Sequence, residues 1–185
     1  FYMLAKPGYY DAYVKSGEYA KSDVFTHFGP GYWELKGSRW GIIGLGAIGS
    51  RVAHIAQAFG AEVVYYSTSG KNNNTMYKRV DLPELLSTSR VVSIHAPLND
   101  GTANLMNYDR LRQMRTDAIL INVGRGPIVN DSDLAKALDE KLVAGACLDV
   151  LSKEPIESNN PLLHIKEKDR LLITPHIAWI SDVAL

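Results

Sequence analysis

The sequence has little cysteine and no excess of charge of either sign. Cys147 is the only cysteine among 185 residues, which excludes an internal disulfide and a cysteine-based zinc cluster. It lies in an apolar run and is interpreted as a small core side chain in a reducing, cytoplasmic setting. The 20 basic residues are balanced by 20 acidic ones, without a dense lysine or arginine block. Nucleic acid and anionic membranes are therefore not predicted as partners.

Long apolar runs and metal-binding patterns are missing as well. No run approaches the roughly 18 residues of a membrane span, and the N-terminus lacks the basic and apolar regions of a signal peptide. No histidine-rich or paired-carboxylate pattern indicates a metal, and no Gly-x-Ser-x-Gly element indicates a serine nucleophile. A length of 185 residues allows one domain with some additional chain.

From about residue 37 onward, short β-branched apolar runs alternate with helical patterns. Parallel strands need crossover connections and are buried on both faces. Six apolar strands with intervening helices therefore predict an α/β fold with a doubly wound parallel sheet. The expected strands lie at residues 40–43, 62–66, 91–95, 118–122, 144–150 and 171–174, and the expected helices at 47–59, 82–88, 108–114 and 131–140, the last capped by Asn130 or Asp131.

A glycine-rich turn follows the first expected strand and opens the first expected helix. It reads Gly-Leu-Gly-Ala-Ile-Gly, and in this context a G-x-G-x-x-G element is typical of dinucleotide binding. Gly44 permits the tight turn, Gly46 lets the backbone approach a pyrophosphate, and Gly49 lets the helix pack close to the strand. Ala47 and Ile48 begin the helix whose N-terminus would face the anion. The turn predicts a Rossmann-type domain.

The end of the second expected strand bears on the choice of cofactor. An acidic residue is expected there, roughly 20 positions after the glycine turn, where it would bind the ribose hydroxyls of NAD. The sequence instead has Ser67, Thr68, Ser69 and Lys71, without a carboxylate. Hydroxyl groups and a lysine can bind a 2′-phosphate, which a carboxylate would repel. NADP is therefore favoured, while the hydroxyl groups are also compatible with NAD.

The first 36 residues do not follow the alternation of strands and helices. Aromatic residues between Phe1 and Tyr19 indicate a helical lead-in, and residues 25–33 form an arm interrupted by glycine and proline. So many aromatic side chains need a surface to pack on, which is the same domain, a second copy of the chain or a further domain. We expect an N-terminal helix and arm at residues 1–36 and a dinucleotide-binding domain at residues 37–185.

Three charged side chains follow the last three expected strands. Arg125 lies in Asn-Val-Gly-Arg-Gly after one strand, Glu154 follows the next strand shortly after Asp149, and His176 follows the final strand. Ligands of a doubly wound sheet bind beyond the carboxyl ends of its strands. An arginine, a glutamate and a histidine near a dinucleotide form a set suited to catalysis.

Each of these residues also has a structural interpretation. Arg125 alone could be a surface ion-pair partner, Glu154 a turn carboxylate and His176 a core histidine, although their motifs favour function. Asp149 could cap a loop. His95, which precedes Ala-Pro after an expected strand, could pack at a cofactor cleft or have a structural role.

Taken together, the motifs resemble those of the D-2-hydroxyacid dehydrogenases, a family that contains glycerate, D-lactate, formate and 3-phosphoglycerate dehydrogenases and hydroxypyruvate reductases. The resemblance extends from about residue 30 to the end of the chain, and Ser67 departs from it because the family usually has an acid there. Several motifs in one order are far more specific than any single motif. The matching stretches are residues 41–49, 91–98 (VVSIHAPL), 121–129 (INVGRGPIV), 148–155 and 174–179.

The resemblance implies hydride transfer between NAD(P)H and C2 of a small 2-oxo or 2-hydroxy acid. His176 would be the general acid and base, Glu154 would orient its imidazole and favour the cation, and Arg125 would bind the substrate carboxylate. Asp149 would lie near the nicotinamide amide. The other residues assigned to the cofactor cleft are His95, Ala96, Pro97, Thr102, Asn122, Val123, Gly124 and Ala178.

The same resemblance implies a homodimer and a separate substrate domain whose segments are largely absent here. The chain begins at Phe1, and residues 182–185 read as the first turn of a helix capped by Ser181, so we expect a piece of a two-domain enzyme. Such a piece would bind a dinucleotide and turn over substrate poorly. Glycerate, hydroxypyruvate or glyoxylate is the favoured substrate class.

Two other functions compete with a dehydrogenase. One is a non-catalytic, dinucleotide-sensing scaffold such as the corepressors that share the fold and the three charged residues. The other is a cofactor-binding hydrolase or lyase of related fold, such as the adenosylhomocysteine hydrolases, against which the arginine, glutamate and histidine argue.

Overall fold

The computed structural model describes residues 1–180. The chain divides into two compact units, Phe1–Glu34 and the part from Leu35 onward. The helical turn expected at residues 182–185, with Ser181 as its cap, lies outside the described residues. Within residues 1–180, no helix has both the length and the apolar character needed to cross a membrane.

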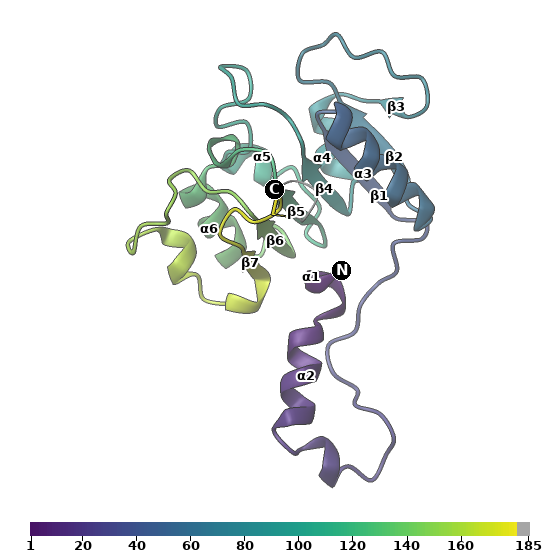
Figure 1. Cartoon of the computed structure of the whole chain (residues 1–185), viewed down its shortest axis with the longest axis vertical. Coiled ribbons are helices and arrows are strands. Elements are labelled where there is room, and N and C mark those ends of the chain that lie inside the picture. Colours follow the sequence, from purple (N-terminus) through teal and green to yellow (C-terminus); the bar gives the residue numbers. More distant parts are fainter. Residues whose placement is uncertain (181–185) are drawn as a thin grey trace. The chain divides into compact units, whose positions relative to one another are not determined.

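The larger unit is built on one sheet of seven parallel strands (Figure 1), which confirms the doubly wound α/β prediction. The strand order is β3-β2-β1-β4-β5-β6-β7, so the chain builds outward from β1 on one side and then crosses to β4 on the other. The strands are β1 (Arg39–Ile43), β2 (Glu62–Tyr66), β3 (Lys78–Arg79), β4 (Val91–Ile94), β5 (Ile119–Asn122), β6 (Gly145–Leu148) and β7 (Leu171–Ile173).

Four helices connect the strands, and three of them begin at a residue whose side chain caps the helix N-terminus. The side chains of Asp81, Asn107 and Asn130 each accept a hydrogen bond from a backbone N–H in the first turn of the helix that follows. The helices are α3 (Ala47–Ala58), α4 (Leu82–Thr88), α5 (Tyr108–Leu111) and α6 (Asp131–Asp139), with short 3₁₀ turns η2 (Gly126–Ile128), η3 (Pro161–His164) and η4 (Lys168–Arg170).

Sequence patterning located most of these elements but missed β3. That strand has only two residues, Lys78 and Arg79, and both are charged and exposed, so no apolar run marks it. The sheet therefore has seven strands instead of the six that we expected. The helix predicted at residues 108–114 ends at Leu111, because turns follow it, and the cap of α6 is Asn130.

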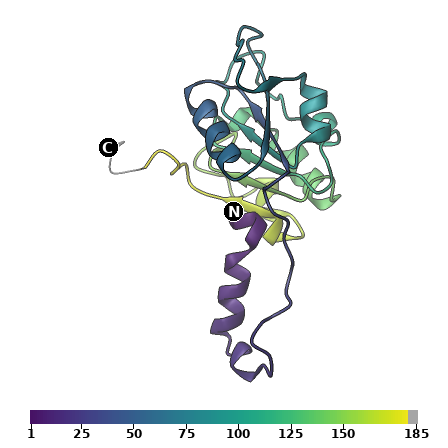
Figure 2. The same cartoon turned by 90° about the vertical axis from the view of Figure 1, so that its right-hand side faces the viewer.

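The core lies on both faces of the sheet. The larger apolar cluster packs the sheet against α4, α5 and α6, and a smaller cluster packs β1 and β2 against α3. Figure 2 shows α3 and α4 on opposite sides of the sheet. Burial on both faces is the reason why the central strands read as nearly continuous apolar runs.

The point where the strand order reverses lies between β1 and β4. Here Gly44 has a φ of 91°, and a Cβ on it would lie 2.8 Å from the Ala96 backbone. The backbone of His95 also donates a 2.8 Å hydrogen bond to the carbonyl of Ile43. The carboxyl ends of β1 and β4 are thus in close contact at the position where doubly wound sheets bind ligands.

The N-terminal unit contains α1 (Tyr2–Ala5), α2 (Pro7–Lys15) and η1 (Tyr19–Lys21), followed by an extended arm. His27 fastens the arm to α2, because its ring stacks on Tyr13 at a centroid distance of 3.7 Å and its Nε2 lies 2.9 Å from the Tyr9 hydroxyl. Phe25 and Phe28 stay 91% and 90% exposed. The lead-in is helical, as its aromatic pattern predicts.

Candidate functional site

The glycine turn leaves an open cradle at the N-terminus of α3. Gly46 is the N-cap of α3, and a Cβ on it would meet no protein atom. Ala47 and Ile48 follow it and are exposed. The first N–H groups of a helix have no intrahelical acceptor and carry a partial positive charge. The turn therefore presents backbone donors and free space where a pyrophosphate would bind, and the residues present fit a dinucleotide.

Gly49 is required for a different reason from Gly46. A Cβ on Gly49 would lie only 2.3 Å from the carbonyl oxygen of Gly44. This contact is with backbone, which cannot move aside as the end of a side chain can. Gly49 therefore permits the close packing of α3 against the turn, whereas Gly46 keeps the cradle open.

The segment after β2 contains the residues on which the prediction of NADP rests. Ser67 is buried, and its hydroxyl oxygen accepts a 3.2 Å hydrogen bond from the backbone of Asn72. Ser69 and Lys71 are exposed, and Thr68 is half-buried. The side chain of Asn72 donates a 2.5 Å hydrogen bond to the carbonyl of Leu45, in the glycine turn. This amide ties the segment to the cradle.

His176 and Glu154 form a charged pair beyond the ends of β6 and β7. Nδ1 of His176 lies 2.6 Å from Oε2 of Glu154, whose other oxygen accepts a 2.8 Å hydrogen bond from the backbone of Leu151. Burial raises the pKa of Glu154, but the hydrogen bonds from Leu151 and His176 outweigh it, so this pKa lies below its ordinary value. An ionised Glu154 can hold Nδ1 of His176 as a hydrogen-bond donor, which leaves Nε2 as the ring nitrogen available to a ligand.

Asp149 holds the loop that carries His176. Its carboxylate is nearly buried and accepts hydrogen bonds from the Thr174 hydroxyl at 2.6 Å and from the backbones of Ile177 and Ala178 at 2.9 and 2.8 Å. Burial alone would raise the pKa of Asp149. The hydrogen bonds lower this pKa by more than burial raises it, so it lies below its ordinary value. The contacts match the interpretation of Asp149 as a loop cap, and a contact with the nicotinamide amide stays a prediction.

Arg125 lies on the loop after β5 and is exposed. Buried Asn122 orders this loop, because its side chain accepts from the backbone of Gly124 at 3.1 Å and donates to the carbonyl of Arg125 at 3.0 Å. The Arg125 guanidinium donates to the carbonyl of Gly124, and across residues 1–180 no carboxylate lies within 4.0 Å of it. Arg125 is therefore not the surface ion-pair partner that an isolated arginine would suggest.

The Arg125 loop lies directly against the loop that contains Glu154. A Cβ on Gly126 would overlap the carbonyl oxygen of Leu151, at 1.7 Å, so no other residue fits at position 126 without moving the backbone. Leu151 is the residue whose N–H binds Glu154. The structure thus brings Arg125, Glu154 and His176 onto adjoining loops at one edge of the sheet.

Two clefts meet at Asp149 and Thr174. The first, of about 510 Å³, has Glu154 and His176 on a mainly apolar wall, and the second, of about 360 Å³, contains Val123 and Ala178. Cys147 is half-buried and lines the second cleft, so the prediction of a core side chain is wrong. Cys147 lies on the face of the sheet that packs against α3. Helix α3 covers this face over β1 and β2 only, and Cys147 lies in β6. Burial raises the pKa of its thiol to about 11, which keeps it protonated.

The remaining residues that were predicted to lie at the cofactor cleft differ in how deeply they are buried. His95 Nε2 lies 3.1 Å from the Ser93 hydroxyl, and burial lowers the pKa of His95 to about 4, so its ring is neutral at pH 7. Thr102 is fully buried, and its hydroxyl donates to the carbonyl of Pro97 at 2.7 Å, which gives it a loop-ordering position. Ala96 is buried, whereas Pro97 is exposed on the surface.

A family model for the NAD-binding domain of D-isomer specific 2-hydroxyacid dehydrogenases matches residues 2–178. This chain belongs to that family. The resemblance seen in the motifs is thereby confirmed. A glyoxylate reductase of Aeropyrum pernix is 43% identical over 150 residues, covering 78% of this chain and 43% of its own length. A hydroxypyruvate reductase of Blautia hydrogenotrophica is 38% identical over 176 residues, covering 93% of this chain and 53% of its own length.

Solved structures agree with the family assignment. A D-isomer specific 2-hydroxyacid dehydrogenase of Lactobacillus delbrueckii in its NAD-complexed form has a TM-score of 0.79 at 27% identity, over 99% of this chain and 58% of its own. An acyclic imino acid reductase in complex with NADPH and D-Arg has a TM-score of 0.79 at 30% identity, over 94% of this chain and 54% of its own. The chain spans about half the length of the curated relatives it matches.

Sequence reasoning missed several residues that shape this 2-hydroxyacid dehydrogenase domain. Gly126 was visible in its motif, but its contact with Leu151 joins segments far apart in the sequence. Thr174 is the first residue of the His176 motif, but nothing in the motif signals that its hydroxyl binds Asp149. Asn72 is one of three consecutive asparagines, and nothing in that run distinguishes the one that reaches the glycine turn.

The two glycines of the turn predict opposite effects of alanine. Gly46→Ala should leave the free energy of unfolding unchanged and weaken NADH and NADPH binding by about tenfold or more, because the added methyl group occupies the cradle. Gly49→Ala should lower the free energy of unfolding by about 1–3 kcal/mol, because its methyl group overlaps the Gly44 carbonyl. Urea unfolding and cofactor fluorescence titration measure the two effects. Normal dinucleotide affinity of Gly46→Ala would place the pyrophosphate elsewhere.

Proposed function

We propose that this chain is the cofactor-binding part of an NAD(P)-dependent oxidoreductase that interconverts small 2-oxo and 2-hydroxy acids. The observation that carries the proposal is the 2.6 Å contact between His176 and Glu154, on the same sheet edge as the glycine cradle. Arg125, without a carboxylate partner in residues 1–180, supplies a cation on the loop that adjoins the loop of Glu154. The chain covers about half of each relative, so the substrate pocket of the complete protein includes residues beyond this domain.

The proposed chemistry assigns one task to each charged residue. A nicotinamide cofactor held at the glycine turn would supply or accept the hydride at C2. In reduction, Nε2 of His176 donates a proton to the carbonyl oxygen, and in oxidation it takes the proton from the hydroxyl group. Glu154 holds Nδ1 and keeps the imidazole oriented. Arg125 binds the substrate carboxylate with its planar fork and polarises the carbonyl group.

We propose NADP as the preferred cofactor and glyoxylate, hydroxypyruvate or glycerate as the substrate class. The NADP preference rests on the absence of a carboxylate among Ser67–Lys71. The substrate class rests on the relatives named glyoxylate reductase, hydroxypyruvate reductase and glycerate dehydrogenase. Both fit the cytoplasmic location that the composition suggests.

We further propose that residues 1–36 form a dimer contact. The arm leaves apolar side chains facing solvent, with Phe25, Phe28 and Tyr32 exposed by 91%, 90% and 63%. Exposed aromatic clusters of this kind mark protein interfaces. Since His27 and its tyrosine neighbours fasten the arm to α2, the exposed rings are displayed on an ordered segment.

Turnover separates an oxidoreductase from a non-catalytic dinucleotide sensor. The complete protein should oxidise NADPH or NADH with glyoxylate or hydroxypyruvate. Arg125→Lys should lower kcat/KM by about 100-fold or more and leave the cofactor Kd unchanged, because lysine lacks the bidentate fork. Arg112→Lys, on the exposed helix end, is the matched control. An equal loss of cofactor affinity in Arg125→Lys would assign the residue to the cofactor instead.

The pH profile tests the pair of His176 and Glu154. The lowered pKa of Glu154 keeps its carboxylate charged at neutral pH, 2.6 Å from Nδ1 of His176. Glu154→Gln removes the charge, so the basic limb of the reductive profile should move to lower pH by about one unit. Glu157→Gln, on the same loop and paired with Lys153, should leave the limb in place. An unmoved limb in Glu154→Gln contradicts the assigned role.

Light scattering tests the dimer contact. The chain should have twice the mass of one copy, and the double variant Phe25→Ser, Phe28→Ser should have the mass of a single copy, because both rings are exposed and their loss leaves the fold intact. Met76→Ser removes another exposed apolar side chain, from the loop after β2, and should stay dimeric. A monomeric wild-type chain at high concentration would refute the contact.

A further inference from the structure

The loop between β2 and β3 is folded back toward the glycine cradle. The Asn72 amide reaches the Leu45 carbonyl, and the Tyr65 hydroxyl donates to the carbonyls of Asn72 and Asn74 at 3.2 and 3.3 Å. Figure 1 shows this loop extending beyond β2 and β3. Residues 67–80 contain three cations and no carboxylate. Lys71 on this loop and Arg79 at its end therefore give an ordered, positively charged wall beside the dinucleotide cradle.

Arg79 brings a guanidinium to this wall from the end of β3. It pairs in register with Tyr65, so the two side chains lie on the same face of the sheet. Its Nη1 donates to the carbonyl of Asn72 at 3.3 Å, and its Nη2 lies 3.9 Å from the position that a Cβ on Gly70 would take. The guanidinium thus lies beside the segment of Ser67 to Lys71, although it is distant from that segment in the sequence.

Arg79 has capacity to bind an anion. It is exposed, and in the part of the chain that the structure describes no carboxylate comes within 4.0 Å of it. One of its five N–H donors is used by Asn72, which fixes the direction of the group and leaves the others available. An oriented and uncompensated guanidinium is suited to a phosphate.

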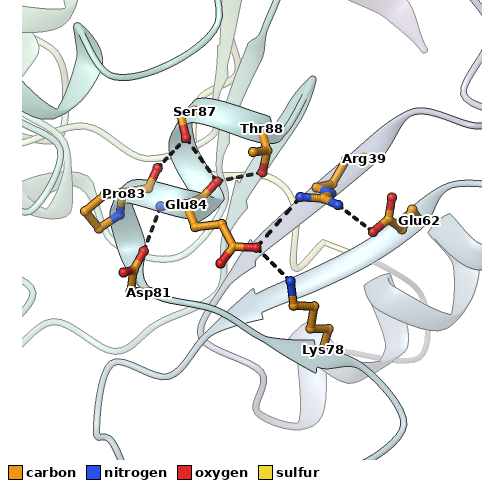
Figure 3. A network of polar contacts seen from close by, with 8 residues as sticks. All are labelled: Arg39, Glu62, Lys78, Asp81, Pro83, Glu84, Ser87 and Thr88. Carbon is orange, nitrogen blue, oxygen red and sulfur yellow. Dashed lines mark hydrogen bonds and ion pairs between the residues drawn. The ribbon is translucent and has the colours of Figure 1, made fainter.

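The neighbouring Lys78 is engaged on the opposite face. Its ammonium lies 2.8 Å from Glu84 of α4, and Arg39 approaches the same carboxylate at 4.0 Å while pairing with Glu62 at 2.7 Å (Figure 3). Adjacent residues of a strand point to opposite faces, so Lys78 cannot take part in the wall formed by Arg79. Lys78 and Arg79 are therefore two neighbouring cations of which one is neutralised and one is not.

We propose that Arg79, together with Lys71 and the hydroxyl groups of Ser67 to Ser69, binds the 2′-phosphate of NADP(H) and so sets the cofactor preference. A guanidinium, an ammonium and hydroxyl donors suit a phosphate, whereas the two ribose hydroxyls of NAD are best bound by a carboxylate, which this wall lacks. The proposal rests on the proposed function, because it assumes that the cradle binds a dinucleotide.

The test uses ligands that differ only in the 2′-phosphate and need no hydride transfer. Calorimetry compares adenosine 2′,5′-bisphosphate with AMP, and NADPH with NADH, on the wild-type chain and on Arg79→Ala. The wild type should prefer the phosphorylated member of each pair. Loss of a charge-assisted contact should weaken the binding of adenosine 2′,5′-bisphosphate and NADPH by roughly 10- to 100-fold, and leave AMP and NADH within about twofold.

Two further variants keep the result specific. Lys78→Ala removes the neighbouring cation on the other face and should change neither pair of affinities. Arg79→Lys keeps the charge without the planar fork and should retain part of the preference. Far-ultraviolet circular dichroism of each variant should match that of the wild type, because both side chains are exposed.

The remaining outcomes contradict either the proposed 2′-phosphate site or the proposed function on which it rests. An equal loss for AMP and adenosine 2′,5′-bisphosphate in Arg79→Ala would place the guanidinium on the adenosine, and unchanged affinities would remove it from the site. If Lys78→Ala weakened the binding of adenosine 2′,5′-bisphosphate and NADPH as much as Arg79→Ala, the preference would arise from the overall positive charge of the region and not from a specific contact of Arg79. A wild type that binds NADH as tightly as NADPH refutes the 2′-phosphate site alone, whereas a wild type that binds neither refutes the proposed function.

Discussion

The parallel arrangement of the seven strands is the constraint on which the rest of the structure depends. In a parallel sheet every strand ends at the same edge, so the segments that follow β1, β2, β5, β6 and β7 meet there regardless of their separation in the sequence. The glycine turn, the hydroxyl segment and the loops of Arg125, Glu154 and His176 are those segments. Crossover helices and burial on both faces follow from the same constraint, and the apolar strands satisfy it.

Loops that meet at one edge of a sheet do not form a site unless they hold fixed conformations. Buried polar side chains fix the loops of this site. Asp149 uses both carboxylate oxygens to hold the loop of His176, and Asn122 uses both ends of its amide to shape the loop of Arg125. Gly126 then lets the loop of Arg125 contact the loop of Glu154 at Leu151. Each group is hydrogen-bonded within the protein, which is the condition under which a polar side chain can be buried.

The distribution of charge separates stabilising residues from those available to ligands. Most cations near the sheet have a carboxylate partner, as Lys78 has in Glu84 and Arg90 has in Asp117. Arg125 and Arg79 have none among residues 1–180, and each is instead oriented by a single bond to a backbone carbonyl. A balanced net charge therefore conceals two local excesses of positive charge, both at the edge of the sheet where anionic ligands would bind.

The amino-acid sequence by itself determined the order of strands and helices, the glycine turn and the family, because these depend on local periodicity and on motifs of adjacent residues. It could not determine that Asp149 reaches Thr174, that Cys147 lines a cleft or that two charged residues form β3. Nor could it show that Arg79 lies beside Gly70 while Lys78 turns away. Those facts depend on which face of which strand a side chain occupies, and only the assembled sheet decides that.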